Sequence, residues 1–438
     1  MARARRIALK VLARVERERA FAAAALEAEL KGVADARDAS LATELVYGAL
    51  RYRPWLDGLL AGASARGLDG LDPVALEALR VAAYELAFLD RVPAHAAVNE
   101  AVREISSKRG KGLAGFANAI LHRLAADRAA LSPPDPASAA DPASALGLPP
   151  WLFARLVAAF GRERAIAMGR AFNAPSRRTL RINTSRIDLE SARVRLGDGA
   201  AAGQYLPWAI DAPDRSAARA LEDEGLAAHQ DEGAGLVVAA LDPKPRERIL
   251  DACAGRGGKT AAIAQIASGV ELFACDKQPA KLERLAFELG RQGFEASAAA
   301  CDLAAGDPPF AGPFDRVLLD APCSGTGTLG RRPEIRWRLE PEAVASLVEL
   351  QRALLDRAAR LVRPGGRLVY AVCSVLPEEC DGHLAPFLAA HPGFALVAVP
   401  PPLWPAAIDW QDGAPIVDPG VTRTDGYGIL CFTRDQRD

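Results

Sequence analysis

Leu250-Asp-Ala-Cys-Ala-Gly-Arg-Gly-Gly-Lys-Thr260 decides the fold, because this stretch joins an apolar run to a helical run through a glycine loop. The apolar run covers residues 248–252, and similar strand-like runs follow at 270–275, 296–301, 316–319 and 367–372. Helical runs alternate with them at 260–267, 279–292, 341–362 and 378–390. This alternation predicts a parallel, doubly wound α/β sheet, with edge strands at 394–399 and 429–433.

The remainder of the 438-residue chain divides into regions of different character, as expected for about three domains. Residues 1–130 carry apolar residues at helical spacing and predict an all-α bundle, with helices that include 40–51, 73–89, 96–107 and 115–126. Residues 131–150 are rich in Pro, Ala, Ser and Asp and predict a linker. Residues 151–228 predict a small α+β subdomain, and residues 229–438 form the α/β domain.

Charge is distributed unevenly, although the formal net charge is only −1. The segment 151–186 contains one Glu and eight arginines: Arg155, Arg162, Arg164, Arg170, Arg177, Arg178, Arg181 and Arg186. The following segment, 187–240, is acidic, with ten Asp or Glu residues and four Arg. The basic segment indicates a local site for anions such as RNA phosphates, and the alternative is a solvated helix face.

Several classes of protein are disfavoured by the sequence. No apolar run approaches the length of a membrane span, and the charges near the N-terminus exclude the apolar core of a signal peptide. The seven cysteines contain no CxxC pair, and the five histidines show no metal-ligand spacing. We therefore expect a cytoplasmic protein with reduced thiols, without a disulfide framework, a metal site or a membrane partner.

Acidic residues follow four strand-like runs, at Asp251, Asp276, Asp302 and Asp320. The glycine loop resembles a phosphate-binding loop, but the GxxxxGK[ST] spacing fails because Cys253 occupies the place of the first glycine. An acidic sheet edge suits a cationic cofactor without phosphates better than a dinucleotide. S-adenosylmethionine carries a sulfonium and an α-amino group, and a carboxylate at the second strand can accept both ribose hydroxyls.

Two cysteines also lie at predicted strand ends: Cys323 in Asp320-Ala-Pro-Cys-Ser-Gly-Thr-Gly and Cys373 in Tyr370-Ala-Val-Cys-Ser. A thiolate that adds to carbon 6 of a pyrimidine makes carbon 5 nucleophilic, so two thiols could divide one covalent reaction between an attacking group and a helper. The alternative is that either thiol is a small buried apolar group. These residues alone do not decide which thiol attacks. Four arginines that could raise thiol reactivity lie nearby in sequence: Arg331, Arg332, Arg336 and Arg338.

From about residue 177 to 434, the chain resembles the RNA cytosine-C5 methyltransferases of the RsmB/Nop2/Sun (NSUN) family. The resemblance rests on motifs that occur in family order: Arg181-Ile-Asn-Thr, Gln230-Asp-Glu, Asp320-Ala-Pro-Cys-Ser-Gly-Thr-Gly, Arg332-Pro-Glu-Ile-Arg-Trp, Gln351, Pro364-Gly-Gly, Tyr370-Ala-Val-Cys-Ser and Asp425-Gly-Tyr-Gly. The chain departs from the family at Gly255-Arg256, where Ala-Pro is usual, and at Cys380, where Asn is usual.

The resemblance implies a role for each part of the site. Cys373 is the implied nucleophile, Cys323 assists product release, and Asp320 is placed to hydrogen-bond the cytosine ring. The implied contacts to S-adenosylmethionine are Cys253, Ala254, Gly255, Arg256, Gly257, Gly258, Lys259, Asp276, Asp302 and Asp320. The expected RNA contacts are Arg177, Arg178, Arg181 and Asn183.

Residues 1–130 resemble the NusB-type RNA-binding domain, through Ala39-Ser-Leu-Ala-Thr-Glu-Leu-Val-Tyr-Gly, Pro93-Ala-His-Ala-Ala-Val-Asn-Glu and Phe116-Ala-Asn-Ala-Ile-Leu. A NusB-like domain joined to a Rossmann-like methyltransferase domain is similar to the bacterial RsmB (Sun/Fmu) branch of the family. The implied activity is methylation of carbon 5 of a cytosine in 16S ribosomal RNA by a monomer, on free RNA or an early assembly intermediate. The alternatives are a transfer-RNA cytosine methyltransferase and a non-catalytic ribosome-assembly factor.

Overall fold

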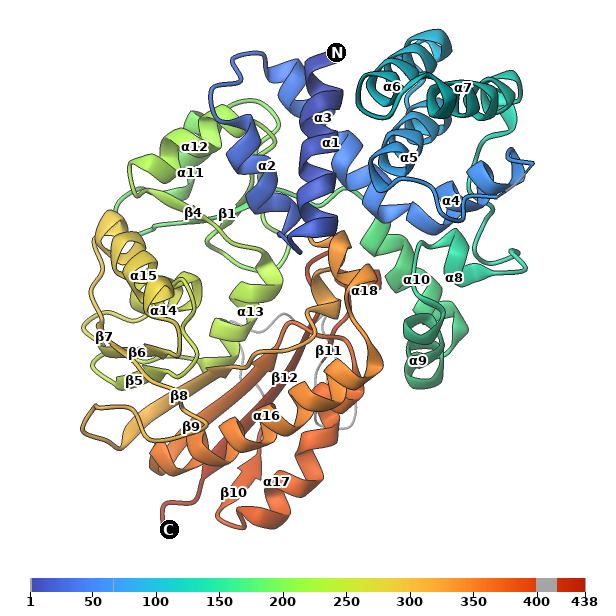
Figure 1. Cartoon of the computed structure of the whole chain (residues 1–438). Helices are drawn as coiled ribbons and strands as arrows, with labels where there is room; N and C mark the ends of the chain where they lie inside the picture. The colour runs from blue at the N-terminus through green and yellow to red at the C-terminus, as the bar shows by residue number, and fades with distance from the viewer. Residues whose placement is uncertain (1, 66, 399–415, 438) are drawn as a thin grey trace. The chain divides into compact units, whose positions relative to one another are not determined.

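The computed structural model describes residues 2–65, 67–398 and 416–437 (Figure 1). The chain divides into two compact units. The first unit comprises Met1–Asn173 together with Arg331–Arg338, and the second comprises Ala174–Gly330 and Leu339–Asp438. No helix of the described ranges has the length and apolar character needed to cross a membrane.

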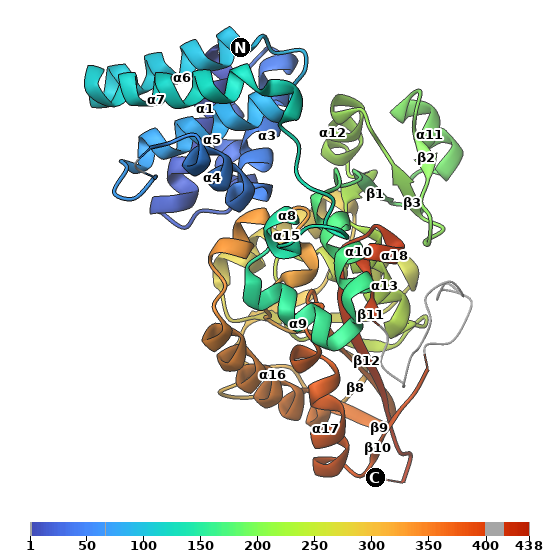
Figure 2. The same ribbon diagram turned by 90° about the vertical axis from the view of Figure 1, so that its right-hand side faces the viewer.

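The first unit is the helical bundle that the sequence predicts. It contains α1 (Ala2–Arg17), α2 (Ala22–Leu30), α3 (Ala36–Arg51), α4 (Arg53–Gly62), α5 (Pro73–Phe88), α6 (Ala94–Arg109) and α7 (Lys111–Ala126). Helices α6 and α7 lie side by side (Figure 2). Asp72 caps α5 by accepting hydrogen bonds from the backbone amides of Val74 and Ala75, and Pro73 occupies the first turn. Helices α2 and α4 were not predicted from the sequence.

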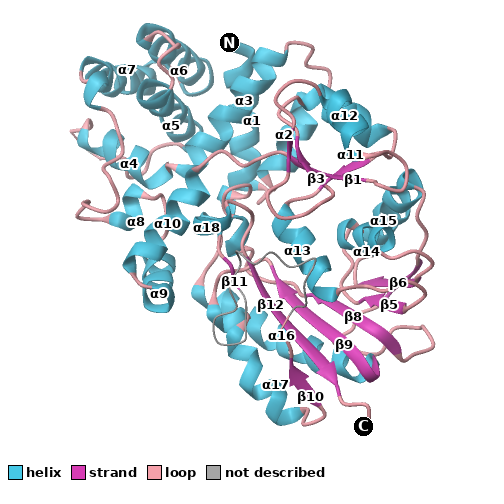
Figure 3. Ribbon diagram, turned by 180° about the vertical axis from the view of Figure 1, so that it is seen from behind, coloured by secondary structure: helices cyan, strands magenta, loops and turns pink. Residues whose placement is uncertain are grey.

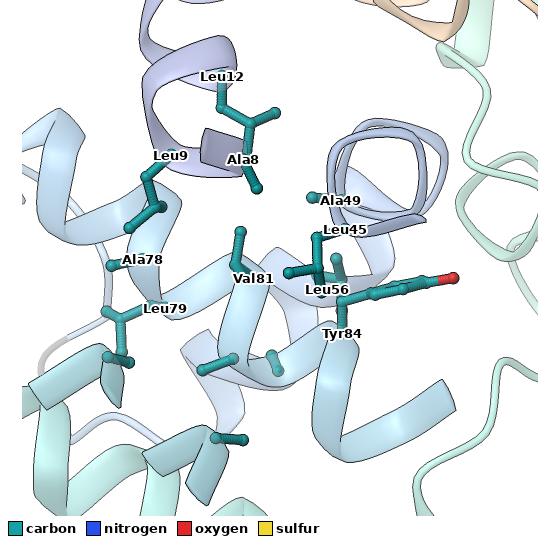
Figure 4. Close-up of a cluster of buried hydrophobic side chains, with 14 of the residues drawn as sticks. Ala8, Leu9, Leu12, Leu45, Ala49, Leu56, Ala78, Leu79, Val81 and Tyr84 are labelled. Atoms are coloured by element: carbon teal, nitrogen blue, oxygen red, sulfur yellow. The ribbon is translucent and has the colours of Figure 1, made fainter. Parts of the chain in front are cut away.

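The core of this bundle is built around α5, which packs against α1, α3 and α7 (Figure 4). Leu12, Leu45, Leu56 and Leu79 are all at most 2% exposed. Close packing of α3 on α5 depends on Gly48, because a Cβ atom there would lie 2.1 Å from Cζ of Tyr84. Burial of this apolar surface supplies the main stabilisation of the bundle, at roughly 25 cal/mol per Å².

The segment 131–150 is more ordered than a plain linker. It contains the short helix α8 (Pro142–Ala145), and the side chains of Leu146 and Leu148 are each 1% exposed. The next helices, α9 (Pro150–Phe160) and α10 (Arg162–Asn173), belong to the first unit, although we assigned them by sequence to the small subdomain. Their apolar faces bury Leu156 and Phe172, which composition alone did not reveal.

The segment Arg331–Arg338 also belongs to the first unit, although it is more than 150 residues beyond the rest of that unit in the chain. It contains the 3₁₀ turn Pro333–Trp337. The Arg336 side chain is buried and donates hydrogen bonds to the carbonyl oxygens of Arg51, Leu146, Gly147 and Phe172 and to Oδ1 of Asn173. Burial lowers the pKa of Arg336 to about 9.

The second unit contains a small antiparallel sheet with strand order β2-β3-β1-β4. Its strands are β1 (Thr179–Ile182), β2 (Ala201–Ala202), β3 (Ala209–Asp211) and β4 (Ala227–His229). Helices α11 (Leu189–Leu196) and α12 (Arg215–Asp223) contribute to its apolar core. This arrangement confirms the predicted small α+β part of the chain.

The large sheet confirms the predicted doubly wound α/β fold (Figure 3). Its order is β10-β12-β9-β8-β5-β6-β7, and β11 also pairs with β12. The strands are β5 (Arg248–Asp251), β6 (Glu271–Asp276), β7 (Ser297–Ala300), β8 (Phe314–Asp320), β9 (Val362–Val372), β10 (Phe394–Leu396), β11 (Ile416–Val417) and β12 (Tyr427–Arg434). Neighbouring strands from β7 to β9 are parallel, whereas β12 is antiparallel to its neighbours. Strand order reverses between β5 and β8, so a switch point for ligand binding lies there.

Successive side chains of the central strands enter opposite cores, as the period of two in a β-strand requires. Leu318 and Val369 pack with α13 (Glu232–Leu241) and α14 (Gly258–Ile266) on one face. Leu319 and Tyr370 pack with α16 (Pro341–Leu361) and α17 (Leu384–Ala390) on the other, and Figure 1 shows α16 along the sheet. Helix α15 (Pro279–Gln292) follows β6.

Several predicted element boundaries differ from the structure; for example, β9 begins at Val362 rather than at residue 367, and α3 begins at Ala36 rather than at residue 40. The predicted helix 378–390 begins only at Leu384, because residues 377–379 and 381–383 form 3₁₀ turns that carry the side chains of Glu379 and His383 inward. The predicted strand 394–399 is observed as Phe394–Leu396, and residue 399 lies outside the described residues. The short helix α18 (Pro419–Thr422) precedes β12.

Candidate active site

Three neighbouring parallel strands, β5, β8 and β9, bring their carboxyl ends to one edge of the large sheet. Asp251 pairs in register with Leu318, and Asp320 pairs with Ala371. Cys323 lies three residues beyond the end of β8, and Cys373 follows β9 directly. The sheet register therefore brings together the acidic and thiol motifs that the sequence places far apart.

The two predicted catalytic thiols are in contact. Sγ of Cys323 lies 3.3 Å from Sγ of Cys373, and both residues are half-buried. The hydrogen bond with Cys373, followed by burial, raises the pKa of the Cys323 thiol well above its ordinary value. Cys323 is therefore a protonated thiol at neutral pH, with a hydrogen that it can donate to its neighbour.

A half-buried ion pair lies beside these thiols. Nζ of Lys259, at the start of α14, is 2.6 Å from Oδ2 of Asp320 and 5.0 Å from the centre of the Tyr427 ring. Burial alone would lower the pKa of Lys259, but the charge and hydrogen bond of Asp320, together with the charges of Tyr427 and Cys373, outweigh burial and raise it. Lys259 is therefore a permanent cation within electrostatic range of Cys373. From the sequence, Lys259 was predicted only to contact the cofactor.

The glycine loop is held by the acid of the next strand. Oδ2 of Asp276 accepts a hydrogen bond from the backbone amide of Gly255 at 3.0 Å, and Oδ1 accepts one from Gln278 at 2.9 Å. Gly255 has φ +56°, and a Cβ atom there would meet no described atom within 4 Å. The loop therefore presents open backbone at the switch point, which a bulkier and less flexible residue would restrict.

Asp251 supplies an observation that favours a cationic ligand. Its carboxyl is buried, and Oδ2 accepts a hydrogen bond from Oγ1 of Thr260 at 2.7 Å. Oδ1 has no hydrogen-bond partner among the described residues. Burial raises the pKa of Asp251 to about 7. A buried carboxylate oxygen without a donor fits a ligand that carries an amino group, and such a group would offset the cost of ionising this acid.

The remaining predicted cofactor residues lie on or near the same loop. Cys253 is half-buried, and burial raises the pKa of its thiol, which makes it unreactive. Ala254 is buried, whereas Arg256 is exposed. Asp302 is half-buried and forms an ion pair with Lys277 at 2.7 Å; the hydrogen bond with Lys277 lowers the pKa of Asp302. Among the described residues, no group of His, Cys, Asp and Glu side chains could hold a metal ion.

The structure separates the four residues predicted to contact RNA. Arg181 is buried, with hydrogen bonds from its guanidinium to Oε1 of Gln265 and to Oε1 of Gln292, the latter at 2.6 Å. Asn183 is fully buried, and its side-chain amide donates to the carbonyl oxygens of Gln292 and Gly225. Both side chains are enclosed by the protein, so we withdraw them as RNA contacts. They instead join the small sheet to α14 and α15.

Arg177 and Arg178 are both half-buried, and their side chains remain partly accessible. Nη1 of Arg177 lies 2.9 Å from Oδ2 of Asp211, and Nη2 lies 3.4 Å from Oε2 of Glu232. The Arg336 and Arg338 side chains, considered by sequence as activators of the thiols, bond instead to backbone groups of the first unit. Sequence proximity to Cys323 was therefore a poor guide to their environment.

Comparison with known proteins identifies the family of the chain. The sequence model of a family described as "16S rRNA methyltransferase RsmB/F" matches residues 238–411. "NusB family" matches residues 2–126, and a ferredoxin-like domain of RsmF/B-like methyltransferases matches residues 148–212. The "Ribosomal RNA small subunit methyltransferase B" of Shewanella oneidensis is 31% identical over 407 residues, which cover 92% of each chain.

The chain belongs to the RsmB/F family of 16S rRNA methyltransferases. The protein of the same name from Vibrio cholerae is 33% identical, with 91% of this chain and 90% of the relative covered. Among solved structures, that of PH0851 has a TM-score of 0.82 and 25% identity, over 99% of this chain and 98% of that one. The family thus accounts for the NusB-like bundle, the ferredoxin-like part and the methyltransferase sheet of one chain.

Proposed function

We propose that the protein methylates carbon 5 of a cytosine in 16S ribosomal RNA, with S-adenosylmethionine as methyl donor and Cys373 as the nucleophile. The observation that carries this proposal is the 3.3 Å separation of the Cys323 and Cys373 sulfur atoms, beside the Lys259–Asp320 ion pair. One thiol at a sheet edge is often a buried apolar group, whereas two in contact beside a charged pair suit covalent catalysis.

The cofactor would be held by the glycine loop and the acids around it. The open backbone at Gly255, the unpartnered oxygen of Asp251 and the carboxylate of Asp276 fit the polar groups of S-adenosylmethionine. We further propose that Asp302 contributes to adenine binding. When bound, the cofactor supplies an electrophilic methyl group.

In the proposed reaction, the Cys373 sulfur forms a bond to carbon 6 of the cytosine, and Asp320 hydrogen-bonds the ring. The positive charge of Lys259 stabilises the Cys373 thiolate before attack. After carbon 5 has gained its methyl group, water takes the proton from carbon 5, and the electron pair of the C5–H bond forms the C5=C6 double bond as the C6–S bond breaks. The electron pair of the C6–S bond returns to Cys373 in this step, and the Cys323 thiol stabilises the departing sulfur by a hydrogen bond.

The test is methylation of 16S ribosomal RNA from a strain that lacks this gene, with bisulfite mapping of the product. We expect Cys373→Ala to be inactive and to form no covalent complex. Cys323→Ala should accumulate a protein–RNA complex that survives denaturing electrophoresis, and the double variant should lose it. If Cys373→Ala instead traps RNA, the two roles are reversed. Methylation found only on transfer RNA would refute the ribosomal substrate.

We propose Arg177 and Arg178 as contacts to RNA phosphates, with free RNA or an early assembly intermediate as substrate, a monomeric enzyme and a cytoplasmic location. Replacing both arginines by Ala should lower the slope of log affinity against log salt concentration by about 0.7 for each lost contact to single-stranded RNA. Affinity for S-adenosylmethionine should not change. An unchanged slope would show that neither arginine contacts a phosphate.

A further inference from the structure

A buried carboxylate stands behind the Cys323 loop. Glu379 is 0% exposed and lies in the 3₁₀ turn Pro377–Glu379, six residues after Cys373. Oε1 of Glu379 accepts a hydrogen bond from the backbone amide of Ser324 at 2.8 Å, and Oε2 accepts one from the Ser324 hydroxyl. The carboxylate thus binds both the backbone and the side chain of the residue that follows Cys323.

Gln351 of α16 extends this contact to the residue that precedes Cys323. Its Nε2 donates to Oε1 of Glu379 and to the carbonyl oxygen of Pro322, both at 2.9 Å. Its Oε1 therefore faces Nε2 of His383 at 3.0 Å and accepts a hydrogen bond from it. Burial lowers the pKa of His383 to about 4, so this ring is neutral. Both chain neighbours of Cys323 are consequently fixed by one buried network.

Three hydroxyl groups connect the same carboxylate to the loop of the nucleophile. Oγ of Ser374 lies 2.9 Å from Oγ1 of Thr326 and 3.3 Å from Oγ of Ser324. Ser374 already accepts a hydrogen bond from the backbone amide of Leu376 at 3.0 Å, so its own proton is available to the other hydroxyls. Because Oε2 of Glu379 accepts the proton of the Ser324 hydroxyl, the Ser324 oxygen is left to accept hydrogen bonds from Thr326 and Ser374.

We propose that Glu379 is a positioning residue that holds Cys323 against Cys373 for the release of methylated RNA. This inference rests on the proposed function. In the release step, the electron pair of the C6–S bond returns to Cys373, the electron pair of the C5–H bond forms the C5=C6 double bond, and water takes the proton. Cys323 stabilises the departing sulfur only if its S–H group stays within hydrogen-bond reach, and Glu379 and Gln351 fix that distance.

The charge of Glu379, like its hydrogen bonds, supports Cys323 as a hydrogen-bond donor. The contact with Cys373 and burial raise the pKa of Cys323, and the negative charge of Glu379 raises it further. Cys323 therefore keeps its hydrogen, as a donor must. The side-chain hydrogen bonds of Glu379 go to Ser324 and Gln351, so its effect on catalysis passes through the loop to Cys323.

The test is Glu379→Gln, which keeps the volume of the side chain but replaces one acceptor oxygen by a donor. The new amide must donate to Ser324, which reverses the hydroxyl chain and leaves the Ser374 proton without an acceptor in the chain. We expect the rate of multiple turnovers to fall about tenfold or more, equivalent to about 1.4 kcal/mol. Methyl transfer in a single turnover should stay within about threefold of wild type, and the covalent protein–RNA complex should accumulate.

Matched variants separate positioning from folding. Glu349→Gln makes the same change on α16 at a side chain that is 71% exposed, and it should behave as wild type. Ser324→Ala removes one contact to Glu379 with little loss of volume, and it should trap a smaller amount of the complex. Glu379→Gln combined with Cys323→Ala should match Cys323→Ala alone, because both changes act through one thiol.

Three outcomes would overturn the inference. Equal slowing of methyl transfer and turnover without a covalent complex would show a merely structural role for Glu379. A double variant that loses more activity than Cys323→Ala would show that Glu379 acts elsewhere. If Cys323→Ala traps the complex but Glu379→Gln and Ser324→Ala do not, only the role of Glu379 is overturned. If none of the three variants traps the complex, the proposed chemistry is overturned as well.

Discussion

Arg181 offers the clearest test of whether an arginine of the basic segment is buried in the protein or binds RNA. The sequence suggested that it binds RNA, whereas the structure buries it between β1 and the helices α14 and α15, at 2% exposure. The perturbation is Arg181→Ala. If Arg181 is buried, the change weakens the attachment of the small sheet to α14 and α15 and leaves the contacts between the protein and RNA unchanged.

The expected loss follows from opposing contributions. Burial lowers the pKa of Arg181 to about 10, from an ordinary 12.5, so holding the charge inside costs about 3 kcal/mol. Two charged hydrogen bonds, to Gln265 and Gln292, return about 1.5–3 kcal/mol each. The electrostatic balance is therefore small, and the loss on truncation comes from the cavity and from the buried Gln292 oxygen left without a donor. We expect about 3 kcal/mol in total. Arg181→Met, which fills most of the cavity, should cost less.

Amide hydrogen exchange of β1 (Thr179–Ile182) is the appropriate assay, because a chain with two compact units need not unfold in one step. A loss of 3 kcal/mol corresponds to on the order of hundredfold faster exchange. The salt dependence of RNA binding by folded protein should stay unchanged. Unchanged exchange combined with a shallower salt slope would refute the buried assignment and restore Arg181 as an RNA contact.

Three further predictions concern the glycine-loop acids and the helical bundle. Burial raises the pKa of Asp251 to about 7, from 3.8 in the unfolded chain. The contribution of its protonated carboxyl to the free energy of unfolding is therefore complete below pH 3.8 and is lost as the pH rises through about 7. Asp251→Asn should therefore stabilise the ligand-free protein by about 3 kcal/mol more at pH 8 than at pH 5 in thermal unfolding, and equal effects at both pH values would contradict this. Asp276→Ala should weaken S-adenosylmethionine binding by roughly 1–3 kcal/mol in calorimetry, and unchanged affinity would reject its placement. Gly48→Ala should destabilise the bundle by about 1–3 kcal/mol because Cβ meets the Tyr84 ring, whereas Gly112→Ala, at an open helix position, should stabilise it by up to about 1 kcal/mol.

Local sequence patterns determined much of the architecture. The boundaries of α15 and α16 follow from apolar residues at helical spacing with Pro at the first position, and both helices match the prediction to within one residue. The strands β5, β6, β8 and β9 could be located because parallel strands buried on both faces read as continuous apolar runs, whereas β7 is largely exposed. Their terminal acids and thiols could be placed at one edge, since parallel strands end together. The short helices α2 and α4 were missed.

Only the tertiary structure decided which side chains meet and which are enclosed. The Sγ–Sγ contact joins residues 50 positions apart, and it depends on the register between β8 and β9 and on the loops beyond them. Arginine has the same sequence signature whether it is solvated or buried, so sequence could not separate Arg177 from Arg181, or reveal that Arg336 lies within the first unit. Glu379 reads as a solvent-exposed acid of a helix, because its partners Ser324 and Gln351 come from other elements. Local patterns specify the backbone conformation and which face of a helix or strand is apolar. The burial of a particular polar side chain and its hydrogen-bond partners arise only when distant segments pack together.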